Sequence, residues 1–522
     1  MKAIPLRSPC SRCPLNRRAF LARASAAALG AVTLPAALDA AQKNPATART
    51  RVRIIFALHD EVQPGPDWPN KGFDFRPVMQ RITGELSRRC REVEFLTTKA
   101  ANEEQARQIL AADQATGDVD GYIVYQMNAW NRVIQPVAAS GKPVLFADFP
   151  YGGSGGFLVY NAALLRAGSR NVGYIASSNL KDVAAAANGF AILKRGGSVA
   201  DFVAATDRVR VERTRKPGRR DCKPDDVKCL EPAECLRRLR DAKLLAVRNN
   251  EPGRVTEILG IKVQPLTFNE LDEAWQRADR DAARALARDW QRAARRIEGV
   301  TVETLESCAA MYLACEAVMK KHGAVGITIN CLGGFYGGHL RAYPCLGFCE
   351  LNNRGQIGGC ECDVRSAVTM LVGTTLTQGR PGYISDPVLD IATRRIIYAH
   401  CVAPTKVFGP DGPANPFEIL THSEDRAGAS MRSLLPLGYM TTSVELDEGK
   451  KEILLHRARA VANDPDDRAC RTKLAAEPVG DNEKLFREWD RWGWHRVTFY
   501  GDLLEPFRAL GRALGWKVTE EA

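Results

Sequence analysis

The sequence lacks the features that identify several common classes of protein. Beyond residue 40 it has no run of roughly 18 uninterrupted apolar residues, the length that spans a bilayer. No internal repeat is present, and we expect no Gly-x-Ser-x-Gly elbow between a strand and a helix. The Gly-rich segments 152–156 and 333–338 lack the Lys-Ser/Thr ending of a phosphate-binding loop. Membrane-spanning, repeat, serine-hydrolase and P-loop proteins are therefore excluded, and both Gly-rich segments are expected to be mobile connections or substrate-side loops.

Aromatic residues are missing from the most basic part of the chain. The 73 Lys and Arg residues exceed the 61 Asp and Glu residues, which gives a formal net charge of +12. Much of this excess lies between Arg208 and Arg220. A nucleic-acid-binding face requires a matching fold and interleaved aromatic side chains. We therefore expect no nucleic-acid partner, and we expect this segment to be a solvated loop or a contact for an anionic glycan.

The N-terminus resembles a twin-arginine export signal. Arg17 and Arg18 precede Phe20 and Leu21, and an Ala-rich, weakly hydrophobic run with a plausible cleavage site at 38–40 follows. We assign residues 1–40 to this signal and exclude them from the fold. The mature protein is then periplasmic or otherwise exported, with no stable membrane span; without a functional signal it would be cytoplasmic.

Fifteen cysteines is a high count for a chain of 522 residues. Two leave with the predicted signal, and the odd number that remains forbids complete pairing within one chain. Three cysteines lie in a polar stretch: Cys222, Cys229 and Cys235. In an oxidising compartment one disulfide could form among them, and their spacing fits no zinc-binding template. Others lie in apolar runs and are expected to be buried as small hydrophobic residues, among them Cys308, Cys315 and Cys331.

Strand and helix patterns alternate over the first part of the mature chain. The strand patterns cover 51–58, 93–96, 120–125 and 143–147, and the helix patterns cover 73–91, 102–113 and 129–140. This alternation predicts a parallel sheet covered by helices on both faces, which binds ligands beyond the carboxyl ends of its strands. We assign residues 41–170 to this N-terminal α/β domain.

Two further domains are expected, because 522 residues exceed one ordinary hydrophobic core. A second α/β domain is predicted over 171–380; it carries Glu361, with strand patterns at 171–175, 243–247 and 324–330 and helix patterns at 270–296 and 302–321. Residues 381–522 mix β-like segments with two helix patterns and are assigned to an α+β domain. The predicted fold class is thus α/β, with two doubly wound parallel-sheet domains followed by an α+β C-terminal domain.

Two carboxylates and one imidazole stand at the edges of well-marked elements. Glu361 follows a Gly-Gly-Cys turn, Asp386 precedes a proline that favours extended backbone, and His495 lies between Trp-Gly-Trp and a strand pattern. Asp363 is predicted to cap the helix that follows it. Carboxylate and imidazole ligands together suit manganese, iron or zinc, and such a site can leave positions open for substrate oxygens. We predict that Glu361, Asp386 and His495 bind one divalent cation.

Four other polar residues have weaker patterns. His400 ends a strand pattern and is equally consistent with substrate contact and with the core. Asp390 and His422 lie in polar segments and are expected to be structural, and Glu350 is expected to be solvated.

The residues around the predicted ligands resemble the L-fucose isomerase and L-arabinose isomerase superfamily. The resemblance covers roughly 170–522 and is best from Cys345 onward; it includes Cys360–Asp363, Asp386 and the Trp-Gly-Trp-His segment that ends at His495. It implies that Glu361, Asp386 and His495 bind Mn²⁺ or another divalent cation. It also implies that Glu361 and Asp386 carry protons, and that the protein acts on a sugar as a homo-oligomer.

The chemistry of this family accounts for these residue types. Aldose–ketose isomerisation moves a proton between C1 and C2 through an enediol, with a cation on two adjacent sugar oxygens and a carboxylate as the proton carrier. The sequence does not assign which carboxylate is the base. Export departs from the family pattern, so two alternatives stay open: an exported sugar-binding protein without catalytic activity, and a metal-dependent epimerase or lyase that acts on glycan fragments.

Overall fold

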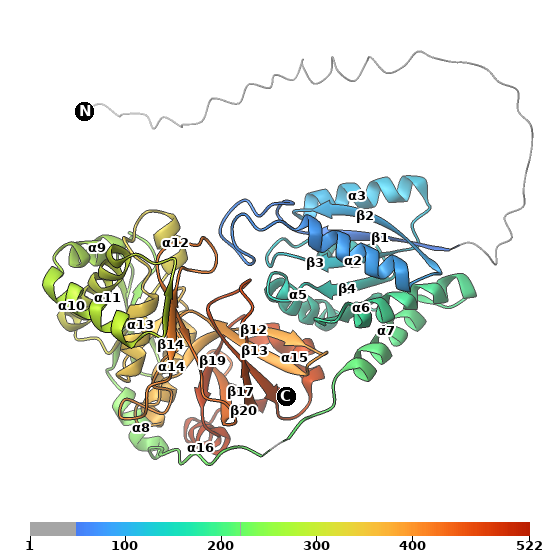
Figure 1. The fold of residues 1–522 in the computed structure, drawn as a ribbon. Coiled ribbons are helices and arrows are strands. Elements are labelled where there is room, and N and C mark those ends of the chain that lie inside the picture. The colour runs from blue at the N-terminus through green and yellow to red at the C-terminus, as the bar shows by residue number, and fades with distance from the viewer. Residues whose placement is uncertain (1–48, 220) are drawn as a thin grey trace, which may run out of the picture. The chain divides into compact units, whose positions relative to one another are not determined.

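The computed structural model describes residues 49–219 and 221–522. The predicted export signal lies outside these residues. Among the helices of the described part, none combines the length and the apolar character that crossing a bilayer requires. Figure 1 shows the arrangement of the helices and strands.

The first sheet is parallel and has five strands in the order β2-β1-β3-β4-β5 (Figure 1). The strands are β1 (Thr50–Ala57), β2 (Val93–Ala100), β3 (Gly121–Gln126), β4 (Val144–Asp148) and β5 (Val172–Ile175). The helices of this region are α2 (Arg76–Arg89), α3 (Glu103–Thr116), α4 (Ile134–Ala139), α5 (Ser154–Arg166), α6 (Leu180–Ala187), η2 (Asn188–Arg195) and α7 (Val199–Arg213). This strand order is one of the two common doubly wound arrangements.

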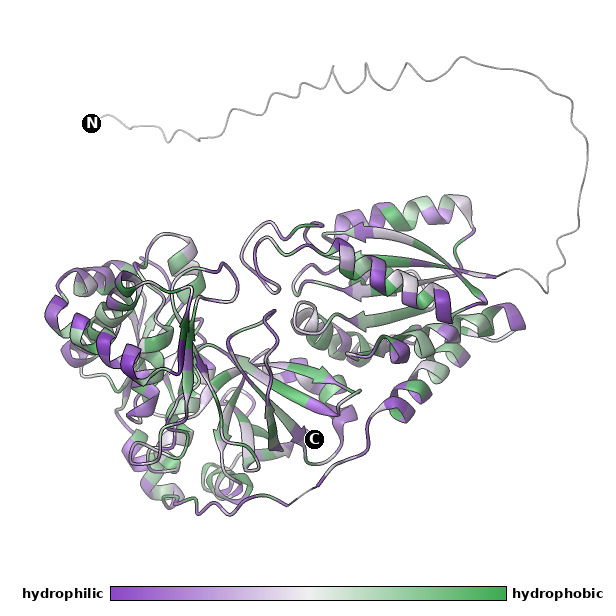
Figure 2. Cartoon of the chain, in the orientation of Figure 1, coloured by the Kyte–Doolittle hydropathy of each residue, from purple (hydrophilic) through white to green (hydrophobic). Residues whose placement is uncertain are grey.

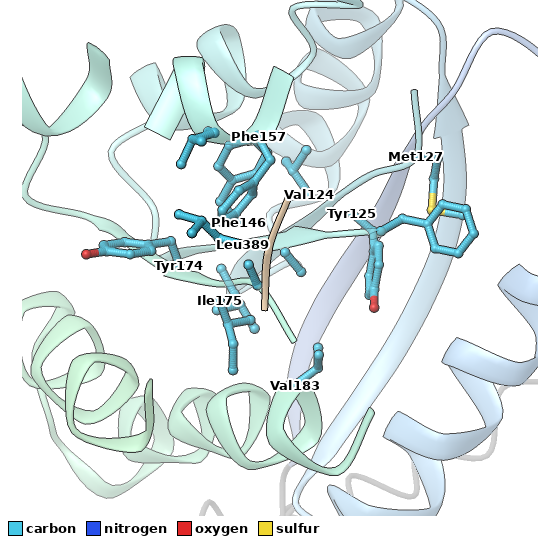
Figure 3. Packing of buried hydrophobic residues seen from close by; sticks show 14 of the residues in the cluster. Val124, Tyr125, Met127, Phe146, Phe157, Tyr174, Ile175, Val183 and Leu389 are labelled. Atoms are coloured by element: carbon cyan, nitrogen blue, oxygen red, sulfur yellow. The ribbon is translucent and has the colours of Figure 1, made fainter. Parts of the chain in front are cut away.

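Burial on both faces explains the continuous apolar runs of this sheet. Strands β3, β4 and β5 are buried along their whole length, and Val124 and Phe146 belong to one cluster with Phe157 of α5 and Val183 of α6 (Figure 3). Leu389, from the C-terminal part of the chain, belongs to the same cluster. The first sheet therefore shares its core with later elements.

The second sheet has the order β11-β10-β6-β8-β7, parallel except for β7 at one edge. Its strands are β6 (Lys243–Val247), β7 (Thr256–Ile258), β8 (Ile261–Leu266), β10 (Gly326–Ile329) and β11 (Ile357–Gly359). The helices are α8 (Pro232–Leu239), α9 (Phe268–Gln276), α10 (Arg280–Ala293), α11 (Val302–His322), α12 (Cys331–Tyr336), α13 (Cys345–Asn353) and α14 (Val364–Leu376). Helix α10 is amphipathic: it is mostly hydrophilic in Figure 2 and buries Ala283, Ala287 and Trp290 along one face.

The C-terminal part forms an antiparallel barrel. Six strands follow the order β16-β19-β12-β13-β18-β17, and pairing of β16 with β17 closes the ring. They are β12 (Tyr383–Asp390), β13 (Arg395–His400), β16 (Met440–Asp447), β17 (Glu452–Asn463), β18 (Thr472–Pro478) and β19 (Arg496–Tyr500), with β20 (Lys517–Glu520) added in parallel to β17. A small sheet joins β9 (Arg296–Glu298), β14 (Phe417–Leu420) and β15 (Ser430–Ser433). The remaining helices are α15 (Asn482–Glu488), η3 (Trp489–Trp492) and α16 (Leu504–Leu514).

The prediction of a mixed α/β fold with parallel sheets is confirmed, and the domain boundaries stay predictions. Some local expectations were wrong. The strand at 172–175 is the fifth strand of the first sheet rather than the start of the second. The predicted helix 270–296 is two helices, because Asp279 caps a new one by accepting from the backbone N–H groups of Asp281 and Ala282.

Four further expectations also differ from the structure. Both Gly-rich segments contribute helical turns, to α5 and α12, so they are not loops throughout. The first reads Gly-Gly-Ser-Gly-Gly and lies at the junction of β4 and α5, so the expectation of no Gly-x-Ser-x-Gly at a strand–helix junction was wrong; its Ser154 is buried and donates to Asp148. The basic segment begins inside α7, where Arg210 is buried against Glu483 and Tyr174. In the described part of the chain, Cys229 and Cys235 form no disulfide.

Candidate metal centre

Glu361 lies just beyond the carboxyl end of β11, in a left-handed backbone conformation. Its φ is +60° and that of Cys362 is +51°, values that a residue with a side chain adopts at a cost of about 1 kcal/mol or more. The turn ends at Asp363, whose carboxylate accepts from the backbone N–H of Ser366 and caps α14. This tight turn between β11 and α14 fixes the position of Glu361.

Asp386 lies on β12, between two antiparallel neighbours. On one side Asp386 pairs with Ala399 of β13, and on the other Ser385 pairs with Arg496 of β19. His400 follows Ala399 at the end of β13, and His495 directly precedes β19, so the register brings both imidazoles beside Asp386. The barrel thus brings three polar side chains together around Asp386.

The four side chains converge on one point. The Nε2 atom of His495 lies 3.1 Å from Oδ1 of Asp386 and 3.5 Å from Oε2 of Glu361. The Nε2 atom of His400 lies 3.7 Å from Oε1 of Glu361 and 3.8 Å from Oδ2 of Asp386. One ligand atom from each of the four residues lies within 4.8 Å of the others.

The four side chains of this cluster differ in their exposure to solvent. The side chains of Asp386, His400 and His495 are 7%, 1% and 8% exposed, whereas that of Glu361 is 33% exposed. Glu361 is therefore the member that solvent or a substrate reaches most easily.

Opposite charges hold the cluster together. Burial alone would raise the pKa of Glu361, but the nearby imidazoles of His400 and His495 outweigh it and hold this pKa well below its ordinary value. Burial alone would lower the pKa of His495, but the carboxylates of Asp363, Asp386 and Glu361 raise it well above its ordinary value. The carboxylates thus favour positive charge at the point where the four side chains meet.

The donor set fits a divalent cation. Two carboxylates and two imidazoles are ligands that manganese, iron and zinc accept. The Nε2 atoms of His400 and His495 are buried and, among the described residues, neither makes a hydrogen bond of acceptable geometry, although carboxylate oxygens lie close by. Atoms of this kind, aimed at a common point, fit an ion placed between them.

The opposite nitrogen of His495 is held by a second carboxylate. Its Nδ1 atom lies 2.8 Å from Oδ2 of Asp363, the residue that caps α14. A metal-binding histidine commonly donates its other N–H to a carboxylate, which fixes the ring and its tautomer. Burial alone would raise the pKa of Asp363, but His495 and the N–H and O–H groups of Ser366 lower it to about 2. Asp363 therefore stays ionised in this role.

The segment before His495 is fixed by a glycine and a buried ion pair. Gly493 has a φ of +87°, a backbone conformation that disfavours any residue with a Cβ atom. Arg496 donates to the carbonyl oxygen of His495 and pairs with buried Glu521 at 3.0 Å. These features account for the glycine and help to hold the backbone of His495.

The structure brings together all three predicted ligands, Glu361, Asp386 and His495. It adds His400, which sequence reasoning left undecided, and its position at the end of a strand was the only available signal. Asp363 caps its helix as predicted, but its contact with His495 was not foreseen.

The other candidates have structural surroundings. Asp390 accepts hydrogen bonds from Ser178, Ala392 and Thr393, which agrees with the expected structural role. Glu350 is not simply solvated, because it accepts from the indole N–H of Trp290 at 2.9 Å. Buried His422 stacks on Tyr343.

Comparison with known proteins gives evidence that is independent of this geometry. No protein-family model matches the chain. The chain is similar to a sugar isomerase. This relative, sulfoquinovose isomerase of Clostridium sp. (strain MSTE9), is 23% identical over 301 residues, which cover 55% of this chain and 66% of the relative. The match thus spans just under two thirds of the relative's length.

Among solved structures, an ABC transporter solute binding protein from Burkholderia multivorans is 12% identical. The match covers 56% of this chain and 85% of that chain, with a TM-score of 0.17. At this TM-score the likeness carries no argument about the fold or the function.

Proposed function

We propose that this protein is a metal-dependent aldose–ketose isomerase that moves a proton between C1 and C2 of a sugar. One observation carries the proposal: Glu361, Asp386, His400 and His495, from four different elements, place ligand atoms within 4.8 Å of one another. The similarity to a sulfoquinovose isomerase supports a sugar isomerase, and the resemblance to L-fucose isomerase supports the same reaction.

The four side chains would hold the cation, and Mn²⁺ is the ion that the resemblance implies. When bound, a divalent cation acts as a Lewis acid that polarises substrate oxygens and stabilises negative charge on them. His495 is kept in position by Asp363, and His400 and Asp386 are buried on neighbouring strands. These buried side chains line one side of the site.

We assign the proton transfer to Glu361. Its side chain is 33% exposed, against 7% for Asp386, so it is the carboxylate that faces incoming substrate. Its low pKa keeps it ionised at neutral pH and thus able to accept a proton. A carboxylate oxygen of Glu361 would remove the carbon-bound proton from C2 and return it to C1, while the hydroxyl proton moves from O2 to O1, and the two transfers together convert the aldose into the ketose. Asp386 serves to hold the cation.

Isotope exchange tests the reaction directly. The purified protein is incubated in heavy water with Mn²⁺ and a panel of pentoses, deoxyhexoses, uronic acids and sulfoquinovose, and the products are examined by NMR. A productive substrate should form a ketose with deuterium at C1. Chelation of the metal should stop the exchange, and Mn²⁺ should restore it.

The same experiment separates the alternatives. Sugar binding that survives chelation, with no exchange on any member of the panel, would identify a binding protein instead. Deuterium incorporation without ketose formation would identify an epimerase, and loss of water or of a glycan fragment would identify a lyase.

The proposal also includes export through the twin-arginine pathway and a homo-oligomeric state. Fractionation of the producing cells and light scattering of the purified protein test these two points.

A further inference from the structure

Behind the carboxylate cluster lies a group of buried thiols. Cys345 and Cys349 come from α13, Cys401 follows β13, Cys360 precedes Glu361, and Cys331 starts α12. All five are buried. Buried cysteines are common as small hydrophobic residues, but their sulfur atoms do not ordinarily collect at one point.

The sulfur atoms are close to one another and to histidines. The Sγ atoms of Cys345 and Cys401 are 3.3 Å apart, and those of Cys331 and Cys360 are 3.0 Å apart. Cys401 also lies 3.7 Å from Nδ1 of His400. Cys345, Cys401 and His422 each place one ligand atom within 4.8 Å of the other two.

We propose that Cys345, Cys401 and His422 bind a thiophilic metal ion of the Zn²⁺ class, at a site separate from the carboxylate cluster. Two thiolates and one imidazole form a known zinc donor set, which leaves a fourth position for another ligand. Sulfur ligands select soft ions over Mn²⁺, whereas the carboxylate cluster favours harder ions. The two sites therefore differ in the metal that they accept.

The surroundings of His422 suit a metal ligand. Its ring stacks on Tyr343, with 4.4 Å between ring centroids and 10° between planes, which fixes its orientation. Its Nδ1 atom accepts from the backbone N–H of Glu424 at 3.4 Å, and Oδ1 of Asp425 lies 3.9 Å away, beyond hydrogen-bond distance. Tyr343, on which the ring stacks, donates its hydroxyl proton to the other oxygen of Asp425.

Binding would couple this site to the carboxylate cluster through Cys401. The ion replaces the thiol protons of Cys345 and Cys401, and both protons leave to solvent. Cys401 Sγ lies 3.7 Å from Nδ1 of His400, so an ion bound at the thiol site would lie behind a side chain of the carboxylate cluster.

Cadmium titration tests the site without reliance on the isomerase proposal. The full chain is purified under reducing, oxygen-free conditions, stripped of metal with a chelator, and titrated with Cd²⁺. Thiolate-to-cadmium charge transfer gives an ultraviolet band that carboxylates do not produce. We expect the band to saturate at one ion per chain, and Zn²⁺ to abolish it by competition.

Single substitutions then locate the site. Cys345→Ala and Cys401→Ala should each lose the saturable band. Cys315→Ala, at a buried cysteine of α11 outside the group, is the matched control and should keep it. Asp386→Asn should also keep it, which would show that the two sites are separate.

Either of two results of the cadmium titration would overturn the proposal. One is a wild-type chain that shows no saturable band, a measurement that does not depend on whether the variants fold. The other is a band that persists in both Cys345→Ala and Cys401→Ala. A Cys345–Cys401 disulfide found by peptide mapping of the wild type, together with no bound zinc, would likewise replace the metal site by a redox pair.

Discussion

Asp148 and Glu361 both lie at the carboxyl end of a parallel sheet, and their surroundings are opposite. Asp148 ends β4 of the first sheet and accepts one hydrogen bond, from the hydroxyl of Ser154 at 2.7 Å. Its other oxygen is buried and, within the described residues, has no hydrogen-bond partner. Glu361 follows β11 of the second sheet and faces two imidazoles.

The protonation states differ accordingly. Burial raises the pKa of Asp148 to about 8, and the Ser154 hydroxyl offsets this only in part. At the second sheet, His400 and His495 hold the pKa of Glu361 well below its ordinary value despite burial. At neutral pH the carboxyl group beyond one sheet is therefore neutral and that beyond the other is ionised, and the difference comes from the imidazoles that the barrel brings to Glu361.

The carboxyl ends of the two sheets differ in the partners of their polar side chains. The polar side chains at the carboxyl end of the first sheet bond to their own loops; Gln126, for example, donates to Asn128, Ala129 and Asn131. At the second sheet, Nε2 atoms of imidazoles lack such partners among the described residues. Similar sheet geometry thus supports a structural edge in one case and a candidate site in the other.

The largest effect is expected from removal of the charges around Glu361. Glu361→Gln, Asp386→Asn and His495→Ala should each lower kcat/KM by about 1,000-fold or more, which corresponds to about 4 kcal/mol of transition-state stabilisation. Circular dichroism should show an intact fold, and metal content should fall in all three variants, because all three side chains are proposed to hold the cation. Wild-type turnover in any of the three would remove that residue from the site.

Next in size is the pH dependence of stability that Asp148 contributes. Between pH 4 and 8 the folded state keeps a proton on Asp148 that the unfolded state has lost, so the free energy of unfolding falls as pH rises, by about 1.4 kcal/mol per pH unit. Asp148→Asn should remove this part of the slope. Urea unfolding at several pH values measures it, and the exposed Asp411→Asn is the matched control. Parallel slopes for wild type and Asp148→Asn would contradict a neutral Asp148.

A smaller effect is expected at Asp363, where the cap and the contact with His495 are separable. Asp363→Asn keeps a capping side chain but loses the charge behind His495, so metal affinity should fall by roughly 10- to 100-fold with little change in stability. Asp363→Ala should lose about 1 kcal/mol of stability in addition. Calorimetric titration with Mn²⁺ and thermal unfolding measure the two effects; equal Mn²⁺ affinity in wild type and Asp363→Asn would limit this residue to capping.

The smallest effect on turnover is expected at the first sheet. Gln126→Ala removes three hydrogen bonds among buried groups and should cost about 1–3 kcal/mol of unfolding free energy. Turnover per folded molecule should stay at the wild-type level. A loss of turnover comparable to that of Asp386→Asn would show that the first edge takes part in the site.

Much of the local structure follows from sequence pattern. The strand predicted at 243–247 is β6 with the same bounds, and the cap predicted at Asp363 starts α14. The Ala- and Arg-rich stretch from 270 to 296 favours helix throughout, so its break before Asp279 depends on capping and packing that composition does not show.

The site was less predictable than the elements. Glu361, Asp386 and His495 were found by their residue types and by a family resemblance. His400 was not assigned, because its approach to Asp386 depends on the pairing of β12 with β13, where Asp386 lies opposite Ala399. Strand register of this kind is set by tertiary packing and is not visible in a single strand.

The left-handed turn at Glu361 has a consequence for engineering. Glycine adopts this backbone angle freely, so Glu361→Gly would relieve local strain in the turn. The same change frees the unfolded chain and removes the carboxylate that faces two imidazoles, so it should cost stability as well as the proposed proton transfer. The strained turn therefore lies where the charged side chain is needed, and a screen of variants at this turn needs an activity assay beside a stability assay.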